Sequence, residues 1–384
     1  MSAIDTAADA GSLAHLETPV PLVDLERLEA NLDRVAAYTA AHGLALRPHT
    51  KTHKSPRLLG AQLARGAVGA TVATRREAEV MAAVADDVLL AYPAVGAAHA
   101  ARVAAVAGRV RLSVALDSER ALADLASSCS AAGAEAGVLV EVDVGMRRCG
   151  VGDPATAVAL ARAAVERDGV RYCGLLFYPG HIRQSPPEQD ADLEALERRL
   201  RAFLDALGNA DLEPLVVSGG STPTLWSSHR IAGLTEIRPG TYVYNDRTTA
   251  AIGACAWEDC AYTVLATVVS VAAPGQAVVD AGSKALGREP LRAGLDDGLG
   301  ALLDRPEVVV ARASEEHGIL DLSSTDWRPA VGERVRVVPN HVCVSVALHE
   351  EVIGVRGGEA VERWRVEARG RLPAGAPENV APIV

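Results

Sequence analysis

The stretch RVRLSVALDSERALADLASSCSAAGAEAGVLVEVDVG (residues 109–145) decides the fold, because two Val/Leu-rich runs flank an Ala-, Ser- and Glu-containing segment of helical period. Short apolar runs of this kind predict buried strands, and the segment between them predicts an amphipathic helix. The same strand–helix unit recurs between residues 20 and 246, giving about eight strands. Alternating units of this number predict a parallel (β/α)8 TIM barrel, with a doubly wound open sheet as the alternative architecture.

Helix signals support the first two units of this barrel. The run PLVD (residues 21–24) is expected to be its first strand, with Asp24 capping a helix that Gly43 ends. In the next unit Ser55 is expected to cap the helix, and Pro56 sits at its first position, where a missing N–H costs nothing.

The sequence pattern changes after about residue 250, where predicted strands no longer alternate with predicted helices. Val-rich runs such as AYTVLATVVSVAAPGQAVVDAG, EVVVARASEEHGIL and ERVRVVPNHVCVSVAL follow one another without long helices between them. We therefore predict a barrel over residues 18–250 and an all-β domain over 251–384, to which residues 1–17 could be added. The segment 284–304 is expected to be a loop or a short helix.

Composition narrows the possible partners and location. The 384 residues carry a formal charge of −11 with no long Lys/Arg run, which argues against a nucleic-acid partner. No apolar stretch is long enough to span a membrane, and the acidic N-terminus does not resemble a secretory signal. The six cysteines form no CxxC pair, so neither a disulfide framework nor a zinc ribbon is expected and a cytoplasmic location fits. The expected partner is a small molecule.

A basic cluster follows the second predicted strand in LALRPHTKTHKSP (residues 44–56), at the edge where barrel enzymes collect their catalytic residues. Neighbouring positive charges lower the pKa of a partly buried lysine, which favours its use as a Schiff-base nucleophile. From these residues alone, a solvated basic loop is the somewhat better interpretation.

The segment RPHTKTHKSP, in the second unit of a barrel followed by a β-domain, resembles the cofactor-lysine segment of the D-serine dehydratase and D-threonine aldolase family. These are alanine racemase-like, fold type III pyridoxal 5′-phosphate enzymes. The resemblance extends from about Thr18 to Val355. It implies that Lys51, and not Lys54, forms the Schiff base with the cofactor and acts as the catalytic base.

Four later loops fit a site for this cofactor. In LVVSGGSTPT, which includes Ser218, the glycines Gly219 and Gly220 would let the backbone approach a ligand, while Ser221 and Thr222 offer hydroxyl and N–H groups to a phosphate. The resemblance implies that Gly240, Thr241 and Tyr242 complete the phosphate site. It also implies cofactor contacts for further residues of the loops after the predicted sixth and seventh strands, namely Arg148, Tyr178 and His181.

The pair His341 and Cys343 suggests a metal site. Two positions apart on a predicted strand, an imidazole and a thiolate face the same way and suit zinc, although a buried cysteine beside a hydrogen-bonded histidine is the simpler interpretation. The resemblance implies that they bind Zn²⁺ or another divalent metal such as Mn²⁺. It also favours the dehydratase branch, because the aldolases usually carry Asp in place of the cysteine, although Val344-Ser345 departs from the usual Pro-Thr of the dehydratases.

The expected activity is therefore that of a pyridoxal phosphate- and zinc-dependent lyase that eliminates water from a β-hydroxy D-amino acid, giving a 2-oxo acid and ammonia. D-serine, D-threonine and 3-hydroxyaspartate are the expected substrates. The alternative is retro-aldol cleavage to glycine and an aldehyde, and an amino-acid racemase or a non-catalytic pyridoxal phosphate-binding protein is less favoured. The resemblance also implies a homodimer.

Overall fold

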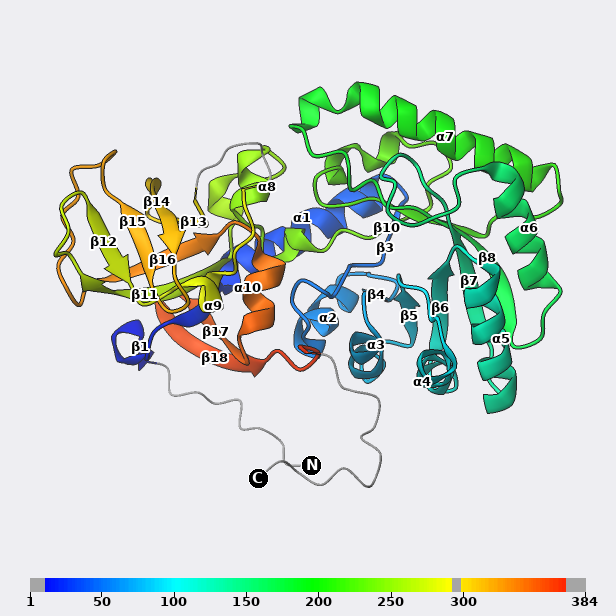
Figure 1. Cartoon of the computed structure of the whole chain (residues 1–384), viewed down its shortest axis with the longest axis horizontal. Helices are drawn as coiled ribbons and strands as arrows, with labels where there is room; N and C mark the ends of the chain where they lie inside the picture. The colour runs from blue at the N-terminus through cyan, green and yellow to red at the C-terminus, as the bar shows by residue number, and fades with distance from the viewer. Residues whose placement is uncertain (1–10, 292–297, 371–384) are drawn as a thin grey trace.

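The computed structural model describes residues 11–291 and 298–370, which form two parts joined through a shared apolar core (Figure 1). One part is a parallel sheet with helices outside it. The other is an antiparallel sheet, and the short helix α10 (Val342–Leu348) lies at the boundary between the two.

The parallel part contains eight strands in the order β3-β10-β9-β8-β7-β6-β5-β4. Their bounds are β3 (Ala45–Leu46), β4 (Ala70–Val72), β5 (Asp87–Leu90), β6 (Arg111–Leu116), β7 (Ala136–Glu141), β8 (Val170–Leu176), β9 (Val216–Gly219) and β10 (Glu236–Ile237). The helices between and before them are α1 (Leu25–Ala41), α2 (Pro56–Leu63), α3 (Arg75–Met81), α4 (Ala97–Ala107), α5 (Glu119–Ala132), α6 (Pro154–Val165), α7 (Asp190–Gly208) and the 3₁₀ helix η3 (Leu225–Arg230).

Backbone hydrogen bonds between β4 and the segment that continues β3 close this sheet into a barrel. The N–H of Thr71 donates to Pro48 O at 2.9 Å, and the N–H of Thr50 donates to Thr71 O at 2.8 Å. The predicted TIM barrel is confirmed. Asp24 caps α1 as expected, accepting hydrogen bonds from Glu26 N and Arg27 N, and Pro56 is the first residue of α2. Ser55 precedes α2 as its N-cap residue, but its side chain makes no capping hydrogen bond.

The second part is a ten-stranded sheet in which six strands close on themselves, because β11 pairs with both β12 and β16. Its bounds are β1 (Gly11–Ser12), β2 (Val20–Asp24), β11 (Tyr262–Ser270), β12 (Gln276–Val279), β13 (Gly300–Leu302), β14 (Arg305–Ala313), β15 (Gly318–Asp321), β16 (Arg334–Pro339), β17 (Glu351–Arg356) and β18 (Glu359–Arg365). The connections include α8 (Arg247–Ala251) and α9 (Ser283–Leu286), so part of the uncertain segment 284–304 is helical, although residues 292–297 lie outside the described chain.

Two sequence expectations are wrong in this part. The run containing PLVD is not the first barrel strand, because β2 pairs antiparallel with β11 and parallel with β17 in the second sheet. The run after Pro339 is not a continued strand, because α10 begins directly behind His341. Val342, Ser345 and Val346 of α10 are buried at helical spacing, so tertiary packing outweighs the strand propensity of its valines.

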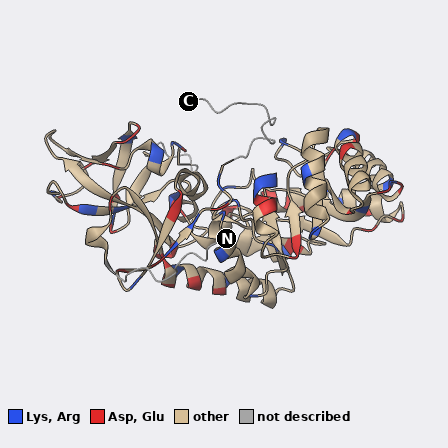
Figure 2. Cartoon of the chain, turned by 90° about the horizontal axis from the view of Figure 1, so that it is seen from below, with Lys and Arg blue, Asp and Glu red and all other residues tan. Residues whose placement is uncertain are grey.

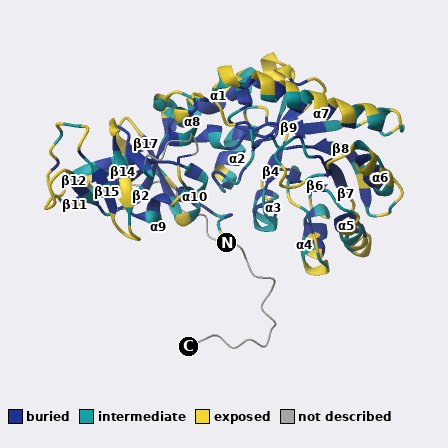
Figure 3. Cartoon of the chain, turned by 45° about the horizontal axis from the view of Figure 1, so that its top comes forward, coloured by how far each residue is buried: buried dark blue, intermediate teal, exposed yellow. Residues whose placement is uncertain are grey.

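Buried and exposed residues are separated as expected for sheets covered by helices. Figure 3 shows buried residues along the strands and exposed residues on the outer faces of the helices, and Figure 2 shows acidic and basic residues interspersed along the chain. Within the described residues, no helix is both long and apolar enough to cross a membrane.

Candidate active site

A cavity of about 340 Å³ opens at the carboxyl ends of the barrel strands, where α10 of the second part meets them. Ten of the predicted site residues line it, namely Lys51, Arg148, Tyr178, Gly220, Ser221, Thr222, Gly240, Thr241, His341 and Cys343. The residues come from both parts of the chain. This convergence is what a barrel active site completed by a second domain requires.

The two lysines of the THK segment have different surroundings. Lys51 lines the cavity, and its Nζ lies 5.9 Å from the ring centre of Tyr178. Lys54 lies in a left-handed backbone conformation, φ 53°, and forms an ion pair with the fully buried Glu77. Because Lys54 is held by this carboxylate, Lys51 is the lysine that can react with a ligand in the cavity.

Buried charges that the sequence analysis did not single out line the floor of the cavity. Arg238 donates to Ser218 Oγ at 2.8 Å and to Phe177 O at 2.9 Å, while its Nε has no hydrogen-bond partner among the described residues. Burial lowers the pKa of Arg238 to about 10, although the negative charges of Glu236 and Glu141 act to raise it. Burial also raises the pKa of Glu141, which lines the same cavity. The side chain of Arg238 lines the cavity, and a buried guanidinium N–H without a partner is a group that calls for an explanation.

Two turns that line the cavity contain glycines at positions where a side chain would be disfavoured. Gly220 has φ +82°, a conformation that other residues rarely adopt, and a Cβ at Gly240 would lie 2.8 Å from both His49 O and Thr52 Oγ1. The turns are tied together, since Tyr242 N donates to Thr222 Oγ1 at 3.2 Å. The two turns predicted to hold a phosphate thus adjoin each other at the cavity, and their contact with a phosphate stays a prediction.

Arg148 and Tyr178 lie together on another wall. The guanidinium carbon of Arg148 lies 4.9 Å from the ring centre of Tyr178, and its terminal nitrogen is 4.0 Å from Glu141 Oε1. The preceding Arg147 does not line the cavity, and its N–H donates to Asp143 Oδ1 at 2.9 Å. Of the two adjacent arginines only Arg148 lines the cavity, and its predicted contact with a cofactor stays a prediction.

His341 and Cys343 reach the cavity from the start of α10 rather than from a strand. Asp246 Oδ2 accepts hydrogen bonds from His341 Nδ1 and from Val342 N, both at 3.1 Å, and Thr52 Oγ1 lies 3.2 Å from Cys343 Sγ. Burial alone would raise the pKa of Cys343, but His341 and Lys51 lower it to about 7, which favours the thiolate. No group of three or more His, Cys, Asp or Glu side chains that could hold a metal ion occurs in residues 11–291 and 298–370.

Four predicted residues do not line this cavity. Ser218 donates to Glu236 at 2.6 Å and accepts from Arg238, and the hydroxyl of Tyr242 accepts from Gln62 at 3.0 Å. Gly219 lies against the ring of Phe177, and His181 lies against Gly145. Their predicted contacts with a cofactor stay predictions.

These features fit the cofactor that the sequence resemblance implies. A planar, phosphorylated pyridine aldehyde needs a lysine, a phosphate cradle and donors around its ring. Lys51, the turns at Gly220 and Gly240, and the guanidinium-bearing Arg238 line one cavity and could supply these groups. Arg238 was missed although it directly follows the last barrel strand, a position that could have revealed it.

Comparison with known families agrees with this site. The model described as "Alanine racemase, N-terminal domain" matches residues 23–248, and the one described as "Putative serine dehydratase domain" matches residues 261–355. The chain is 33% identical to a D-threonine aldolase from an Arthrobacter species, over 93% of this chain and 94% of the relative. It is 36% identical to a D-threo-3-hydroxyaspartate dehydratase from a Delftia species, over 92% and 98% of the two chains.

Solved structures give the same relationship. A D-threonine aldolase from Filomicrobium marinum has a TM-score of 0.86 at 35% identity, covering 94% of this chain and 99% of that one. The Delftia dehydratase has a TM-score of 0.86 at 34% identity, covering 94% and 100%. Structures of that dehydratase include a variant with one histidine replaced by alanine and, two positions further on, a cysteine-to-alanine variant in the metal-free form. The chain thus belongs to the D-serine dehydratase and D-threonine aldolase family of alanine racemase-like, pyridoxal phosphate-dependent lyases.

Proposed function

We propose that the chain uses pyridoxal phosphate and a divalent metal, Zn²⁺ in the first instance, to eliminate water from a β-hydroxy D-amino acid. The observation that carries this proposal is that His341 and Cys343 line the same cavity as Lys51. A general base and a pair of metal ligands in one cavity suit a substrate that loses a proton from Cα and a hydroxyl from Cβ.

Different side chains of the cavity would carry out proton transfer and cofactor binding. Lys51 Nζ would accept the α-proton, and it lies 5.9 Å from the ring centre of Tyr178, over which the guanidinium of Arg148 also lies. Arg238 and the two glycine turns hold and orient the cofactor, whose role when bound is to take up the electron pair left at Cα. Burial, and then the charge of Lys51, hold the pKa of His49 well below its ordinary value, so His49 stays neutral beside them.

The geometry around His341 supports a metal site. Burial alone would lower the pKa of His341, but Cys343 and Asp246 raise it, and Asp246 accepts the proton of its Nδ1. Nε2 is therefore the nitrogen that would bind a metal, and it would give up its own proton on binding. The thiolate of Cys343 is favoured by its neighbours. The Delftia dehydratase supports the same view, since a histidine and a cysteine two positions apart were its sites of substitution and the cysteine variant was metal-free. A metal bound here would act as a Lewis acid toward the β-hydroxyl.

Cys343 also favours elimination over carbon–carbon cleavage, because that pair of ligand types occurs in a dehydratase relative. Relatives of similar identity are named as aldolases, and one is a 3-hydroxy-D-aspartate aldolase from Paracoccus denitrificans, 30% identical. Retro-aldol cleavage to glycine and an aldehyde is therefore the second candidate function. The cytoplasmic location and the homodimer stay predictions.

A product assay tests the proposal directly. Metal-replete, cofactor-loaded protein is incubated with D-serine, D-threonine and 3-hydroxy-D-aspartate, with and without EDTA, and 2-oxo acid and ammonia are measured against glycine and aldehyde. We expect 2-oxo acid and ammonia that disappear with EDTA, and no activity in Lys51→Ala. Glycine plus aldehyde would establish the second candidate instead. Activity that survives complete metal removal would refute the metal site.

A further inference from the structure

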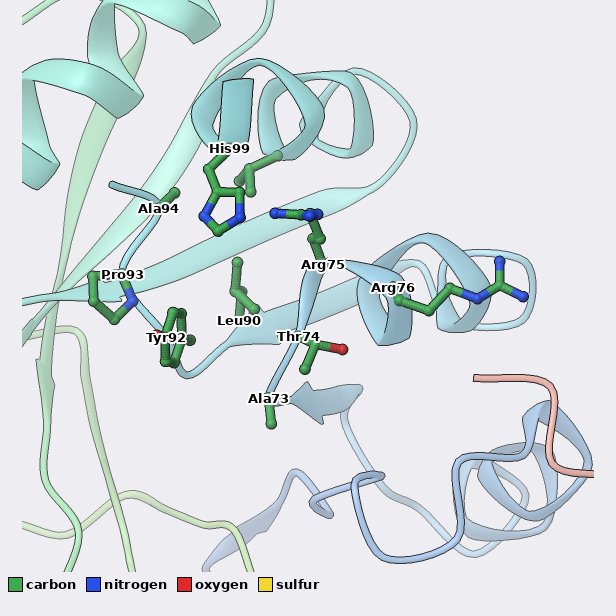
Figure 4. A pocket seen from close by; sticks show the side chains of 10 residues that line it. Ala73, Thr74, Arg75, Arg76, Leu90, Tyr92, Pro93, Ala94 and His99 are labelled. Carbon is green, nitrogen blue, oxygen red and sulfur yellow. The ribbon is translucent and has the colours of Figure 1, made fainter. Parts of the chain in front are cut away.

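Two smaller pockets adjoin the active-site cavity. The larger, of about 110 Å³, lies between the loop that follows β4 and the start of α4, and Ala73, Tyr92 and Pro93 line both it and the cavity (Figure 4). None of its described lining residues carries a thiol. The smaller, of about 10 Å³, shares Thr222 with the cavity and is also lined by Cys255. A cysteine thus lies close to one of the turns predicted to hold a phosphate.

Cys255 is one of two cysteines that contact each other. Its partner is Cys260, and the 3₁₀ helix η5 (Trp257–Asp259) turns the chain between them. The two side chains share a hydrogen bond, and both cysteines are free thiols. Because the thiols already contact each other on a short loop, little movement of the backbone is needed to join them in a disulfide.

The two thiols have different surroundings. Cys260 is 1% exposed and packs with Leu303 and Val338, whereas Cys255 is half-buried. The hydrogen bond with Cys255, and then burial, raise the pKa of Cys260, so Cys260 keeps its proton and can donate it to the other sulfur. Cys255 also interacts electrostatically with the guanidinium of Arg34. A partly exposed sulfur beside a cation and a hydrogen-bond donor is in the surroundings that favour a reactive thiolate.

The loop that carries the two cysteines is held against the barrel. Both carboxylate oxygens of Asp259 accept hydrogen bonds from Arg34 at 2.8 Å, and the backbone carbonyl of Asp259 accepts from Asn31 Nδ2 at 2.8 Å. On the other side of the loop, the carbonyl of Ala254 accepts from Trp226 Nε1 at 2.8 Å. These contacts fix the chain on both sides of the pair, so the thiols are held near each other while they are reduced.

We propose that Cys255 and Cys260 form a reversible disulfide by exchange with a low-molecular-weight disulfide such as oxidised glutathione. The Cys255 thiolate attacks one sulfur of that disulfide, and the glutathione thiolate that leaves takes up the proton that Cys255 gave up. Cys260 then loses its proton and attacks the Cys255 sulfur, and the second glutathione leaves with that proton. The pair loses two electrons and two protons, and one oxidised glutathione becomes two molecules of glutathione. Neither cysteine lines the active-site cavity, so this reaction does not depend on the proposed function.

Peptide mapping of the cofactor-loaded protein tests the proposal. Cleavage by trypsin after Arg247 and Lys284 releases residues 248–284 as one peptide, which contains Cys255, Cys260 and no other cysteine. The protein is incubated with excess oxidised glutathione, free thiols are alkylated with iodoacetamide in denaturant, and the mass of the peptide is measured. We expect most of the peptide to carry neither an alkyl group nor glutathione, and to carry alkyl groups on both cysteines after treatment with dithiothreitol. A peptide that stays alkylated at both cysteines, or that keeps glutathione on one of them, would overturn the proposal.

Variants separate the roles of the two thiols. Cys260→Ala removes the second thiol, so the reaction should stop with glutathione attached to Cys255. Cys255→Ala should leave Cys260 unmodified, because that sulfur is buried. The matched control is Cys149→Ala, which removes an exposed thiol elsewhere and should leave oxidation of the 248–284 peptide unchanged. Glutathione attached to Cys260 in Cys255→Ala, or loss of oxidation in Cys149→Ala, would contradict attack by Cys255. If Cys260→Ala failed to fold, the wild-type peptide map would still decide whether the disulfide forms.

Discussion

Replacing Asp246 by asparagine should separate metal binding from folding. The Asp246 carboxylate serves two sides at once: Oδ2 accepts from His341 Nδ1 and Val342 N, and Oδ1 accepts from Thr249 N at 2.8 Å. An asparagine has one acceptor oxygen and one NH₂ group, so it can satisfy only one side. If the oxygen keeps the helix cap at Thr249, the NH₂ group faces His341 and forces the proton to Nε2, where it blocks coordination.

The expected magnitude follows from that geometry. Loss of the carboxylate that orients a histidine ligand typically weakens metal binding about 10- to 100-fold. The buried N–H of Val342 also loses its acceptor, which costs about 1–3 kcal/mol of folding free energy. A protein that is stable by the usual several kcal/mol should remain folded, so the two effects can be measured on the same sample.

Zinc affinity is measured by competition with a chromogenic chelator, and stability by urea unfolding of the metal-free protein. His341→Ala provides the limit of a lost ligand. Zinc affinity within about twofold of the wild type in a folded Asp246→Asn protein would refute the reasoning, because His341 would then coordinate without help from the carboxylate.

Two further changes test other parts of the site. Lys54→Met should leave the visible absorbance of the lysine-bound cofactor intact. It should lower the free energy of unfolding, measured in urea, by about 3–5 kcal/mol, because the buried carboxylate of Glu77 loses its charged partner. Loss of the absorbance band would instead make Lys54 the cofactor lysine. Gly240→Ala places a Cβ 2.8 Å from His49 O, so we expect weaker cofactor binding in an absorbance titration and a loss of about 1–3 kcal/mol in the free energy of unfolding. The control Gly60→Ala, at a glycine with open space around it, should leave the stability unchanged or raise it. An unchanged cofactor affinity in Gly240→Ala would contradict the close packing of that turn.

The barrel could be predicted from the sequence because each of its strands is a buried apolar run with a helix behind it. The assignment of β2 could not, since PLVD has the same local character and only distant partners decide its sheet. Those partners are Tyr262 of β11 and Ile353 of β17, more than two hundred residues away in the sequence. Local pattern identifies a strand but not the neighbour that it will pair with.

In the site, too, local sequence features could be predicted and long-range contacts could not. Lys51 and the glycine turns could be found because their position after strands and their residue types both carry information. Asp246 could not, because it acts through a contact with His341, 95 residues later in the chain. His341 and Cys343 were expected on a strand, but they lie at the start of α10. Both side chains still line the cavity, because the helix begins between them.

The position of β2 has a consequence for how this chain must be made. In the second sheet β2 lies between β17 and β11, so an N-terminal strand occupies a central place among strands translated last. During synthesis on the ribosome the barrel can assemble first, while β2 waits for its neighbours until most of the chain has emerged. A fragment cut at the apparent boundary near residue 250 would lack this strand and leave β17 and β11 without a common neighbour. The barrel is in effect an insertion within the second domain, and the two cannot be separated by a single cut.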